Sequence, residues 1–286
     1  MSADGVLVID KPAGMTSHDV VDAVRARFET RKVGHAGTLD PDATGVLVLG
    51  LGKATRLLAY GQAGPKRYEA AARFGVATDT QDASGRVLRT SDVSFSRAGL
   101  EEALEGFRGD ISQVPPMVSA VKMGGERLYR KARRGEEVER PARTVTVYSL
   151  DLVHFDPPDA TLEVVCSAGT YVRTLIHDVG SVLGSGAHMT SLRRTGASGF
   201  TLDDAVPLEE AGAEHLRPLA DAVLGLLTID ADAATAAAAA HGRRVPLPDE
   251  VAVEDRQPVA LMREGRLIAV YRREGRMLTA DRVVPA

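Results

Sequence analysis

The sequence predicts a mixed α/β protein with a small β-rich domain at its C-terminus. Three observations support this fold class. Short aliphatic runs are typical of strands, segments with apolar residues at helical spacing lie between several of them, and the end of the chain holds short strand-like runs separated by glycines. Because 286 residues are enough for two domains, we expect one at residues 1–225 and a second at residues 226–286.

The large domain is predicted to begin with an aliphatic strand at residues 5–10, and the Pro and Gly that follow are typical of a turn. Thr16 or Ser17 can then cap a helix that carries valines on one face. Residues 31–45 are polar and rich in Gly, Pro, Asp and Thr, which predicts a long loop. We expect further strands at 46–50, 66–74, 86–89, 143–155 and 160–167, and further helices at 53–60, 97–107 and 174–183.

The small domain is predicted from a change of composition near its start. Residues 231–240 are nearly all alanine, which favours a helix because alanine has the highest helix propensity. Three short strands are expected after it, at residues 258–263, 266–271 and 276–279, with glycine turns between them.

Charge is unevenly distributed along the chain, although its formal net value is only -4. Residues 112–143 have no clear period and are interpreted as a basic insertion, whereas residues 202–232 hold eight acidic side chains against one basic. Such segregation is expected when one face meets phosphates, and a solvated basic helix is the alternative. The basic side chains of the insertion are Lys122, Arg127, Arg130, Lys131, Arg133 and Arg134.

Composition also excludes several classes of protein. Cys166 is the only cysteine, so neither an intrachain disulfide nor a zinc cluster of thiolates can form. It lies in an apolar alternation, where a small buried strand residue is favoured over a nucleophile. No aliphatic run approaches the length of a membrane helix and no secretory signal is visible, so we expect a soluble cytoplasmic protein with no membrane partner.

Two segments offer side chains suited to chemistry. The predicted loop presents His35, Asp40 and Asp42, and its alternative interpretation is an ordinary turn begun by Asp40-Pro41. Arg173 stands where a strand pattern ends and a helix begins, so it can pair with a carboxylate or phosphate or be an ordinary surface arginine. The glycine-rich residues 50–55 lack the residues of a dinucleotide fingerprint or a phosphate-binding loop.

These motifs together resemble the TruB-type tRNA pseudouridine synthases. The resemblance covers about residues 5 to 225 and rests on five motifs in the same order and spacing. They are Gly34-His35-Ala36-Gly37-Thr38-Leu39-Asp40-Pro41 with Ala43-Thr44-Gly45-Val46-Leu47, Gly5 to Ser17 with Asp10-Lys11-Pro12, Lys66-Arg67-Tyr68-Glu69, Gly169-Thr170-Tyr171-Val172-Arg173-Thr174-Leu175, and Leu192-Arg193-Arg194-Thr195 with Gly199-Phe200. The resemblance implies a central, mostly antiparallel sheet flanked by helices, and a PUA-like RNA-binding domain at the C-terminus.

The resemblance also implies a role for individual residues. Asp40 matches the obligatory carboxylate, Arg173 the arginine that pairs with it, and Tyr68 the ring that packs on the target base and takes the C5 proton. The other substrate-binding positions it implies are His35, which fills the stack after the uridine is extruded, Asp82, Tyr171 and Leu192. Lys11 is implied to support the catalytic loop or to contact an RNA phosphate. The reaction needs neither a metal nor a cofactor, because the bond from uracil N1 to the ribose is replaced by one from C5 and no group is gained or lost.

The implied partner is the T-arm stem-loop of tRNA, held by the basic insertion, and the implied target is the uridine at position 55. The chain lacks the long basic tails of guide-RNA-dependent enzymes, so we expect a monomer that needs no guide RNA and no protein partner.

Two alternatives from other classes are an RNA-binding or tRNA-folding module with a purely structural loop, and a hydrolase that uses Asp40 and His35. The hydrolase would need an activated water and usually a metal or a second acid.

Overall fold

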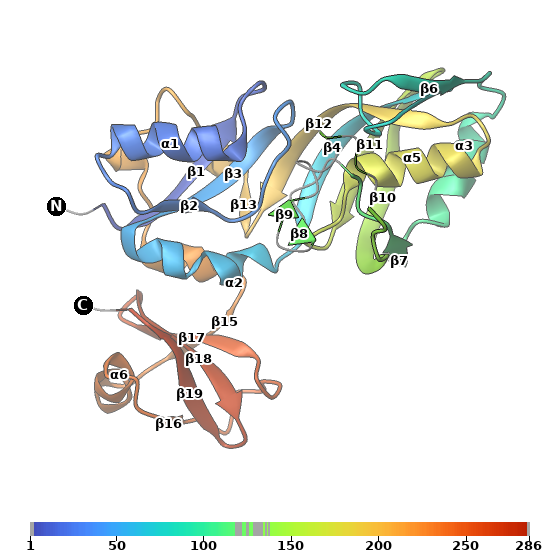
Figure 1. The fold of residues 1–286 in the computed structure, drawn as a ribbon. Coiled ribbons are helices and arrows are strands. Elements are labelled where there is room, and N and C mark those ends of the chain that lie inside the picture. Colours follow the sequence, from blue (N-terminus) through green and yellow to red (C-terminus); the bar gives the residue numbers. More distant parts are fainter. Residues whose placement is uncertain are drawn as a thin grey trace. The chain divides into compact units, whose positions relative to one another are not determined.

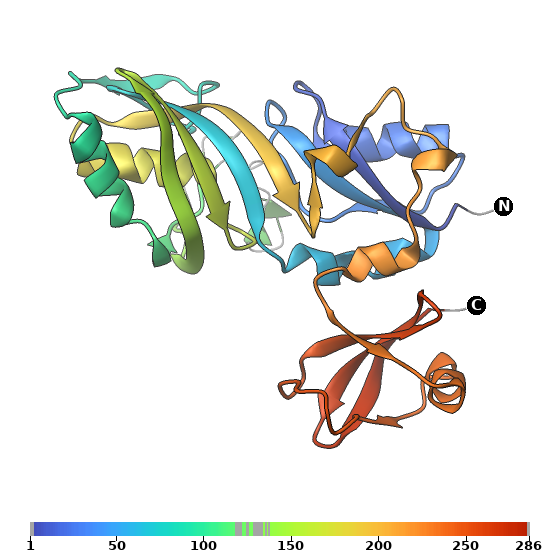
Figure 2. The same ribbon diagram turned by 180° about the vertical axis from the view of Figure 1, so that it is seen from behind.

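The structure is a computed structural model that describes residues 3–117, 122–123, 126–127, 134, 136 and 138–284. It divides into two compact units. The first contains Met1–Pro41, Gly45–Gly64 and Ala197–Ala286, and the second contains Asp42–Thr44 and Pro65–Gly196. Figures 1 and 2 show the elements of both units from opposite sides.

The first unit is built on strands whose side chains alternate between two buried faces. In hydrogen-bonding order they are β14 (Val206–Pro207), β1 (Gly5–Lys11), β3 (Thr44–Leu51) and β2 (Val33–His35). β1 and β3 run antiparallel, from Gly5 opposite Leu51 to Lys11 opposite Gly45. Because successive residues of a strand point to opposite faces, Leu7 and Ile9 enter one apolar cluster and Val6 and Val8 enter another.

Helix α1 (Ser17–Arg27) covers the Leu7 face of this sheet with Val20, Val21 and Val24. Thr16 caps it: the Thr16 hydroxyl accepts from the amide of Asp19 at 3.1 Å, and the amide of Thr16 donates to the Asp19 carboxylate at 2.8 Å. This reciprocal arrangement satisfies two backbone donors at the start of the helix, and it confirms the predicted cap.

The opposite face of the sheet packs on 3-10 segments and on the C-terminal part of the chain. Its cluster takes Ala54 from η1 (Gly52–Arg56), Leu58 from α2 (Leu58–Gln62) and Val223 from η4 (Leu219–Val223). Three residues of the C-terminal strands, Ala260, Leu267 and Val270, belong to the same cluster. The N-terminal strands and the C-terminal sheet therefore share one hydrophobic core.

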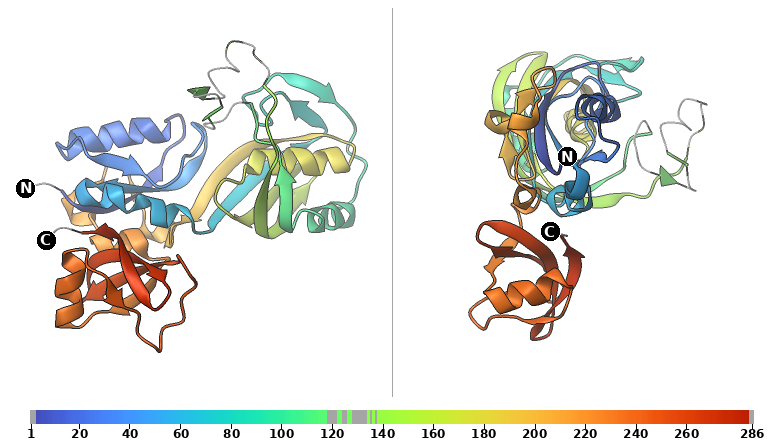
Figure 3. Two further views of the ribbon diagram at one scale, coloured as in Figure 1. Left: turned by 60° about the horizontal axis from the view of Figure 1, so that its bottom comes forward. Right: turned by 90° about the vertical axis from the view of Figure 1, so that its left-hand side faces the viewer.

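The C-terminal sheet has five strands, and its ribbon is drawn in orange and red in Figure 3. Their order is β15 (Leu227–Asp230), β17 (Pro258–Arg263), β18 (Arg266–Glu274), β19 (Met277–Val283) and β16 (Val245–Pro246). Helix α6 (Ala233–Ala240) packs on it through Ala239, and the buried Tyr271 hydroxyl donates to the carbonyl of Arg243 at 2.8 Å. The predicted β-rich C-terminal part is confirmed.

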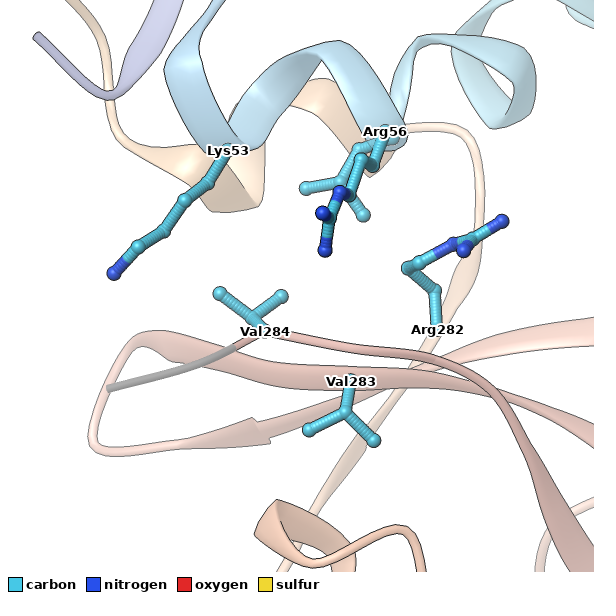
Figure 4. Close-up of a pocket in the computed structure, with 6 residues that line it drawn as sticks. Lys53, Arg56, Arg282, Val283 and Val284 are labelled. Carbon is cyan, nitrogen blue, oxygen red and sulfur yellow. The ribbon is translucent and has the colours of Figure 1, made fainter.

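A small pocket lies between η1 and the end of β19, both in the first unit (Figure 4). Val283 at the end of β19 and the following Val284 form one side, and basic side chains surround much of the rest. Its lining residues are Lys53, Arg56, Leu57, Arg282, Val283 and Val284.

The second unit holds an antiparallel sheet with two helices packed on it (Figure 2). The strands, in order, are β12 (Ala187–Ala197), β4 (Lys66–Phe74), β11 (Asp159–Cys166), β10 (Arg143–Asp156) and β7 (Gly109–Gln113). Helices α3 (Arg97–Glu105) and α5 (Val172–Val182) contribute leucines to its core. Cys166 lies in that core, only 1% exposed, which confirms its predicted place on a buried strand.

The second unit also contains two short hairpins outside this sheet. They are β5 (Val76–Thr78) with β6 (Val87–Thr90), and β8 (Lys122–Met123) with β9 (Glu126–Arg127). Among the described residues, no helix combines the length and the apolarity needed to cross a membrane.

Several predicted elements need correction. The predicted loop at 31–45 contains β2, and the helix expected at 53–60 is divided into η1 and α2. The strands β5, β7, β12, β15 and β16 are absent from the sequence prediction. Most of these strands are short or polar, so their burial comes from neighbours that are distant in sequence rather than from a local alternation. The predicted boundary between two domains at residue 225 stays a prediction.

Candidate active site

The loop that carries Asp40 is held from both sides by buried side chains. On one side, the Ser17 hydroxyl accepts from the amide of Leu39 at 2.8 Å and donates to the carbonyl of Leu39 at 3.2 Å. Ser17 is 2% exposed and sits at the start of α1, where it can reach the loop. Both backbone groups of the residue before Asp40 are thus fixed by one side chain.

On the other side, the ammonium group of Lys11 holds Pro41. Lys11 is fully buried at the end of β1, and its Nζ donates to the carbonyls of Pro12 at 2.8 Å, Met15 at 2.6 Å and Pro41 at 2.9 Å. The carbonyl of Pro41 also accepts from the amide of Gly14 at 3.0 Å. These hydrogen bonds tie the end of β1 to the loop that contains Pro41.

Asp40 itself is half-buried between these two fixed residues. Glycines with positive φ, 122° at Gly37 and 99° at Gly45, allow the sharp bends on either side of it. His35 is at the end of β2, opposite Leu49, and its carbonyl accepts from the Gln62 side chain at 3.3 Å. The first unit therefore brings Lys11 to the loop that carries Asp40, with His35 at the entry to the same loop.

The second unit brings Arg173 and Asp82 together. Arg173 lies in the first turn of α5 and is 3% exposed, and its Nη1 donates to Oδ2 of Asp82 at 2.9 Å. The other carboxylate oxygen of Asp82 accepts from the hydroxyls of Thr80 and Ser84, both at 2.6 Å. Burial raises the pKa of this carboxyl, but the hydrogen bonds and the guanidinium charge together hold it below its ordinary value. Asp82 is thus an ionised partner of Arg173, a pairing that the sequence did not predict.

Tyr171 is the residue before α5, and two guanidinium groups lie over its ring. The Cζ of Arg143 is 4.9 Å from the centre of its ring, and the Cζ of Arg173 is 5.9 Å away. Gln113, which is 1% exposed, accepts from the Tyr171 amide at 2.8 Å and donates to the Tyr171 carbonyl at 3.0 Å. Sequence reasoning missed Gln113 and Arg143 because neither shows a local signal, and only the fold brings them to Tyr171.

Tyr68 and Leu192 stand on strands β4 and β12, and both are partly buried against the core of the second unit. Near Tyr68, Lys66 is 5% exposed and pairs with Cys166 in the sheet register. Burial, followed by the charge of Arg194, lowers the pKa of Lys66 to about 8, while Cys166 acts in the opposite direction.

The basic insertion is described only in part. Arg134 donates to the Glu136 carboxylate at 2.7 Å, and the backbones of Lys122 and Arg127 pair in the hairpin β8–β9. The predicted RNA contacts Arg130, Lys131 and Arg133 lie outside the described residues.

Comparison with known families supports one interpretation of these two groups of residues. A sequence model of the TruB family pseudouridylate synthase N-terminal domain matches residues 25–172, and one of the tRNA pseudouridylate synthase B C-terminal domain matches residues 173–223. The chain belongs to the TruB family of pseudouridylate synthases. As a member it is a tRNA pseudouridine synthase, which is an isomerase, and the predicted resemblance is confirmed.

Individual relatives agree over most of the chain. The tRNA pseudouridine synthase B of Pseudomonas aeruginosa (strain UCBPP-PA14) is 52% identical over 214 residues, 75% of this chain and 70% of the relative. That of Burkholderia mallei (strain NCTC 10247) is 44% identical over 293 residues, 98% of this chain and 97% of the relative. The family is thus shown by its sequence models and by relatives, one of which matches over nearly its full length.

Solved structures agree with the fold class. The crystal structure of a Cbf5-Nop10-Gar1 complex gives a TM-score of 0.80 at 28% identity, covering 99% of this chain and 86% of that chain. The structure of an H/ACA RNP bound to a substrate RNA containing 2'-deoxyuridine gives a TM-score of 0.77 at 26% identity, covering 98% of this chain and 85% of that chain. The predicted mixed α/β fold with a mostly antiparallel sheet is confirmed.

Proposed function

We propose that this enzyme converts the uridine at position 55 in the T-arm loop of tRNA to pseudouridine, with Asp40 as the essential carboxylate. The observation that carries the proposal is the anchoring of Asp40 from both sides, by Ser17 through Leu39 and by Lys11 through Pro41. A catalytic side chain accelerates a reaction most when its backbone is rigid, because no conformational entropy is then lost in placing it.

In the proposed reaction, the bond between uracil N1 and ribose C1' breaks, the base turns in place, and a bond from C5 to C1' forms. The proton that C5 loses balances the one that N1 gains, so no co-reactant is needed. Asp40 assists the cleavage as nucleophile or through proton transfer, Arg173 serves as its guanidinium partner, and Tyr68 packs on the base and takes the C5 proton. His35, Asp82, Tyr171 and Leu192 complete the substrate-binding set.

The RNA is proposed to be held by the basic insertion, whose cationic side chains would meet backbone phosphates. The target base must leave its stack, which costs a few kcal/mol and least outside a regular duplex. Neutralising Arg130, Lys131, Arg133 and Arg134 should weaken RNA binding and flatten its salt dependence by about 0.7 to 0.9 in slope for each phosphate that is no longer bound. An unchanged slope in filter binding at several salt concentrations would contradict this part of the proposal.

We also propose that the chain works alone in the cytoplasm, as a monomer, on tRNA without a guide RNA or a protein partner, and that its C-terminal sheet is a PUA-like RNA-binding domain. The names of the relatives, tRNA pseudouridine synthase B, support tRNA as the substrate. Activity of the purified chain on a bare transcript, with its mass measured in solution, tests the proposal.

The decisive experiment is tritium release from a tRNA transcript labelled at C5 of uridine. We expect release from the wild type and a loss of at least about 100-fold in Asp40→Asn, since a positioned acid, base or nucleophile contributes at least that much. Asp42→Asn is the matched control, because Asp42 is an exposed carboxylate of the same segment. Equal release by wild type and Asp40→Asn, or release from a transcript with cytidine at position 55, would overturn the proposal.

A further inference from the structure

The basic insertion leaves and re-enters the sheet of the second unit at two residues that face each other. Strand β7 ends at Gln113, β10 begins at Arg143, and these two residues are directly opposite in the β7–β10 register. Just beyond the sheet, Arg140 Nη1 donates to the carbonyl of Pro115 at 3.1 Å, which links the outgoing and returning segments. The base of the insertion is therefore a fixed pair of chains.

From this base, Gln113 reaches the main chain of Tyr171. Its side chain is buried and forms both hydrogen bonds described above, one to the amide and one to the carbonyl of Tyr171. A primary amide is the neutral group that can accept from one backbone group and donate to another in this way. Both polar backbone groups of Tyr171 are thereby held by one residue of the insertion's base.

Arg143 holds the same segment from the other strand. Its guanidinium donates to the carbonyl of Gly169 and lies over the ring of Tyr171, 4.9 Å from the ring centre. A guanidinium over an aromatic ring is attracted by the negative face of the ring. The two residues that flank the insertion thus contact the same three-residue segment, Gly169 to Tyr171.

This segment leads directly into helix α5. Tyr171 is the N-cap of α5, and Arg173 follows two residues later with its salt bridge to Asp82. Arg173 is 3% exposed, and its partner Asp82 is held by Thr80 and Ser84. The start of the helix can therefore shift only if Tyr171 shifts with it. A continuous series of contacts runs from the base of the insertion to Arg173, all within one compact unit.

We infer that Gln113 and Arg143 are positioning residues, which hold the segment Gly169 to Tyr171 and thereby place Arg173 at the start of α5. The inference rests on the proposed function, because that proposal assigns Arg173 to the reaction. Neither residue needs to contact the RNA, so their loss affects the chemical step and not the affinity for tRNA.

The test separates RNA binding from the chemical step. Gln113→Met removes both hydrogen bonds to Tyr171, and Gln113→Glu keeps the acceptor but loses the donor to the carbonyl. We expect the single-turnover rate at saturating enzyme to fall about 10-fold or more in Gln113→Met, in line with the loss of hydrogen bonds to a buried segment, while the Kd for tRNA changes less than about 3-fold. Arg143→Lys, which keeps the charge but loses the planar group, should also lower the rate and not the affinity.

The matched control is Thr146→Val, which removes a hydrogen bond of 2.6 Å to Asp110 between the same two strands without touching Tyr171. It should lower stability slightly and leave the rate unchanged. A double variant of Gln113 and Arg143 should lose less than the product of the two single losses, because both act on one segment.

The outcomes distinguish this inference from the proposed function. If the wild type forms no pseudouridine at position 55, the proposed function fails first. If the wild type is active and Gln113→Met keeps its single-turnover rate, or changes only its Kd, the inference alone is overturned. Should Gln113→Met fail to fold in a thermal melt, Gln113→Glu and Arg143→Lys decide by the same two measurements.

Discussion

At the scale of single residues, side chains that never need to touch a substrate decide where the proposed reacting groups stand. Ser17 and Lys11 each fix the backbone of one neighbour of Asp40. A buried polar group without a hydrogen bond destabilises the folded protein. Ser17 and Lys11 therefore stabilise the fold through the same hydrogen bonds that hold the loop. Their removal should therefore affect stability and activity together.

Ser17→Ala tests this link, with Thr16→Ala as the matched control. Both variants should lower the free energy of unfolding by about 1 to 2 kcal/mol, one through lost loop hydrogen bonds and the other through a lost helix cap. Only Ser17→Ala releases Leu39, so its turnover should fall between about 10-fold and about 100-fold, the cost of a misplaced reacting group. Similar turnover in the two variants, measured by tritium release and urea unfolding, would contradict the assigned role of Ser17.

Lys66 leads to a prediction about pH. In the folded protein its pKa is lowered to about 8, chiefly by burial, whereas in the unfolded chain a lysine titrates near its ordinary value of about 10.4. Between these values the unfolded chain binds more protons, so the contribution of Lys66 to stability rises with pH from about 8 upward. Above about 9 the thiol of Cys166 opposes the rise, because burial raises its pKa to about 11.

The measurement is best made from about pH 7 to 9, and because Cys166 is present in both proteins, the titration of its thiol largely cancels from the difference between them. The difference in unfolding free energy between wild type and Lys66→Met should shift in favour of the wild type as the pH increases across this range. Lys32→Met, at an exposed lysine, is the control and should show no such trend. A difference that stays constant, or that moves against the wild type, in urea titrations would refute the prediction.

At the scale of elements, the position of helix α5 depends on a close approach to the start of β12. A methyl group on Gly180 would lie 2.4 Å from the amide nitrogen and 2.5 Å from Cβ of Ala187, too close for real atoms. Glycine is therefore required at position 180 by the packing rather than by the backbone conformation, since only a missing side chain lets the helix and the strand meet.

Gly180→Ala should lower the free energy of unfolding by about 1 to 3 kcal/mol through overpacking, although alanine is the better helix former. Gly99→Ala in α3 is the control, since its new methyl group would meet nothing closer than 3.7 Å. There the gain in helix propensity should raise stability by up to about 1 kcal/mol. Thermal and urea unfolding of the two variants should thus move in opposite directions, and a stabilised Gly180→Ala would be inconsistent with the close packing.

At the scale of the whole molecule, the C-terminal sheet and the N-terminal strands belong to one compact unit. They share an apolar cluster, and the Tyr60 hydroxyl of α2 donates to the carboxylate of Asp281 on β19 at 2.7 Å. Arg272 also donates to that carboxylate at 2.9 Å, so Asp281 keeps a partner when Tyr60 is changed.

Tyr60→Phe should consequently lower the free energy of unfolding by about 1 to 2 kcal/mol, the value of a hydrogen bond to a charged group. Tyr148→Phe is the control, because Tyr148 is 58% exposed. Because the C-terminal sheet and the N-terminal strands share one core, Tyr60→Phe should still unfold in one cooperative transition, with its midpoint at a lower denaturant concentration than in the wild type. Equal stability of both variants would show that this hydrogen bond contributes little.

The family, the mixed α/β class and the residue proposed as the essential carboxylate could all be predicted from the amino-acid sequence. Aliphatic strands such as β1 and β3 are recognisable because both their faces are buried, and the motif around Asp40 is read directly from consecutive residues. Local pattern was enough wherever the physical cause is itself local, as in the cap at Thr16.

The side chains that hold the site became visible only in the folded protein. The partners Ser17 with Leu39 and Gln113 with Tyr171 are 22 and 58 residues apart, and nothing in either neighbourhood indicates the hydrogen bonds between them. The same holds for strand β12, which local pattern does not predict, and for the salt bridge between Arg173 and Asp82. A buried polar side chain is satisfied by whatever backbone the fold brings to it, so its role becomes readable only once distant segments have packed together.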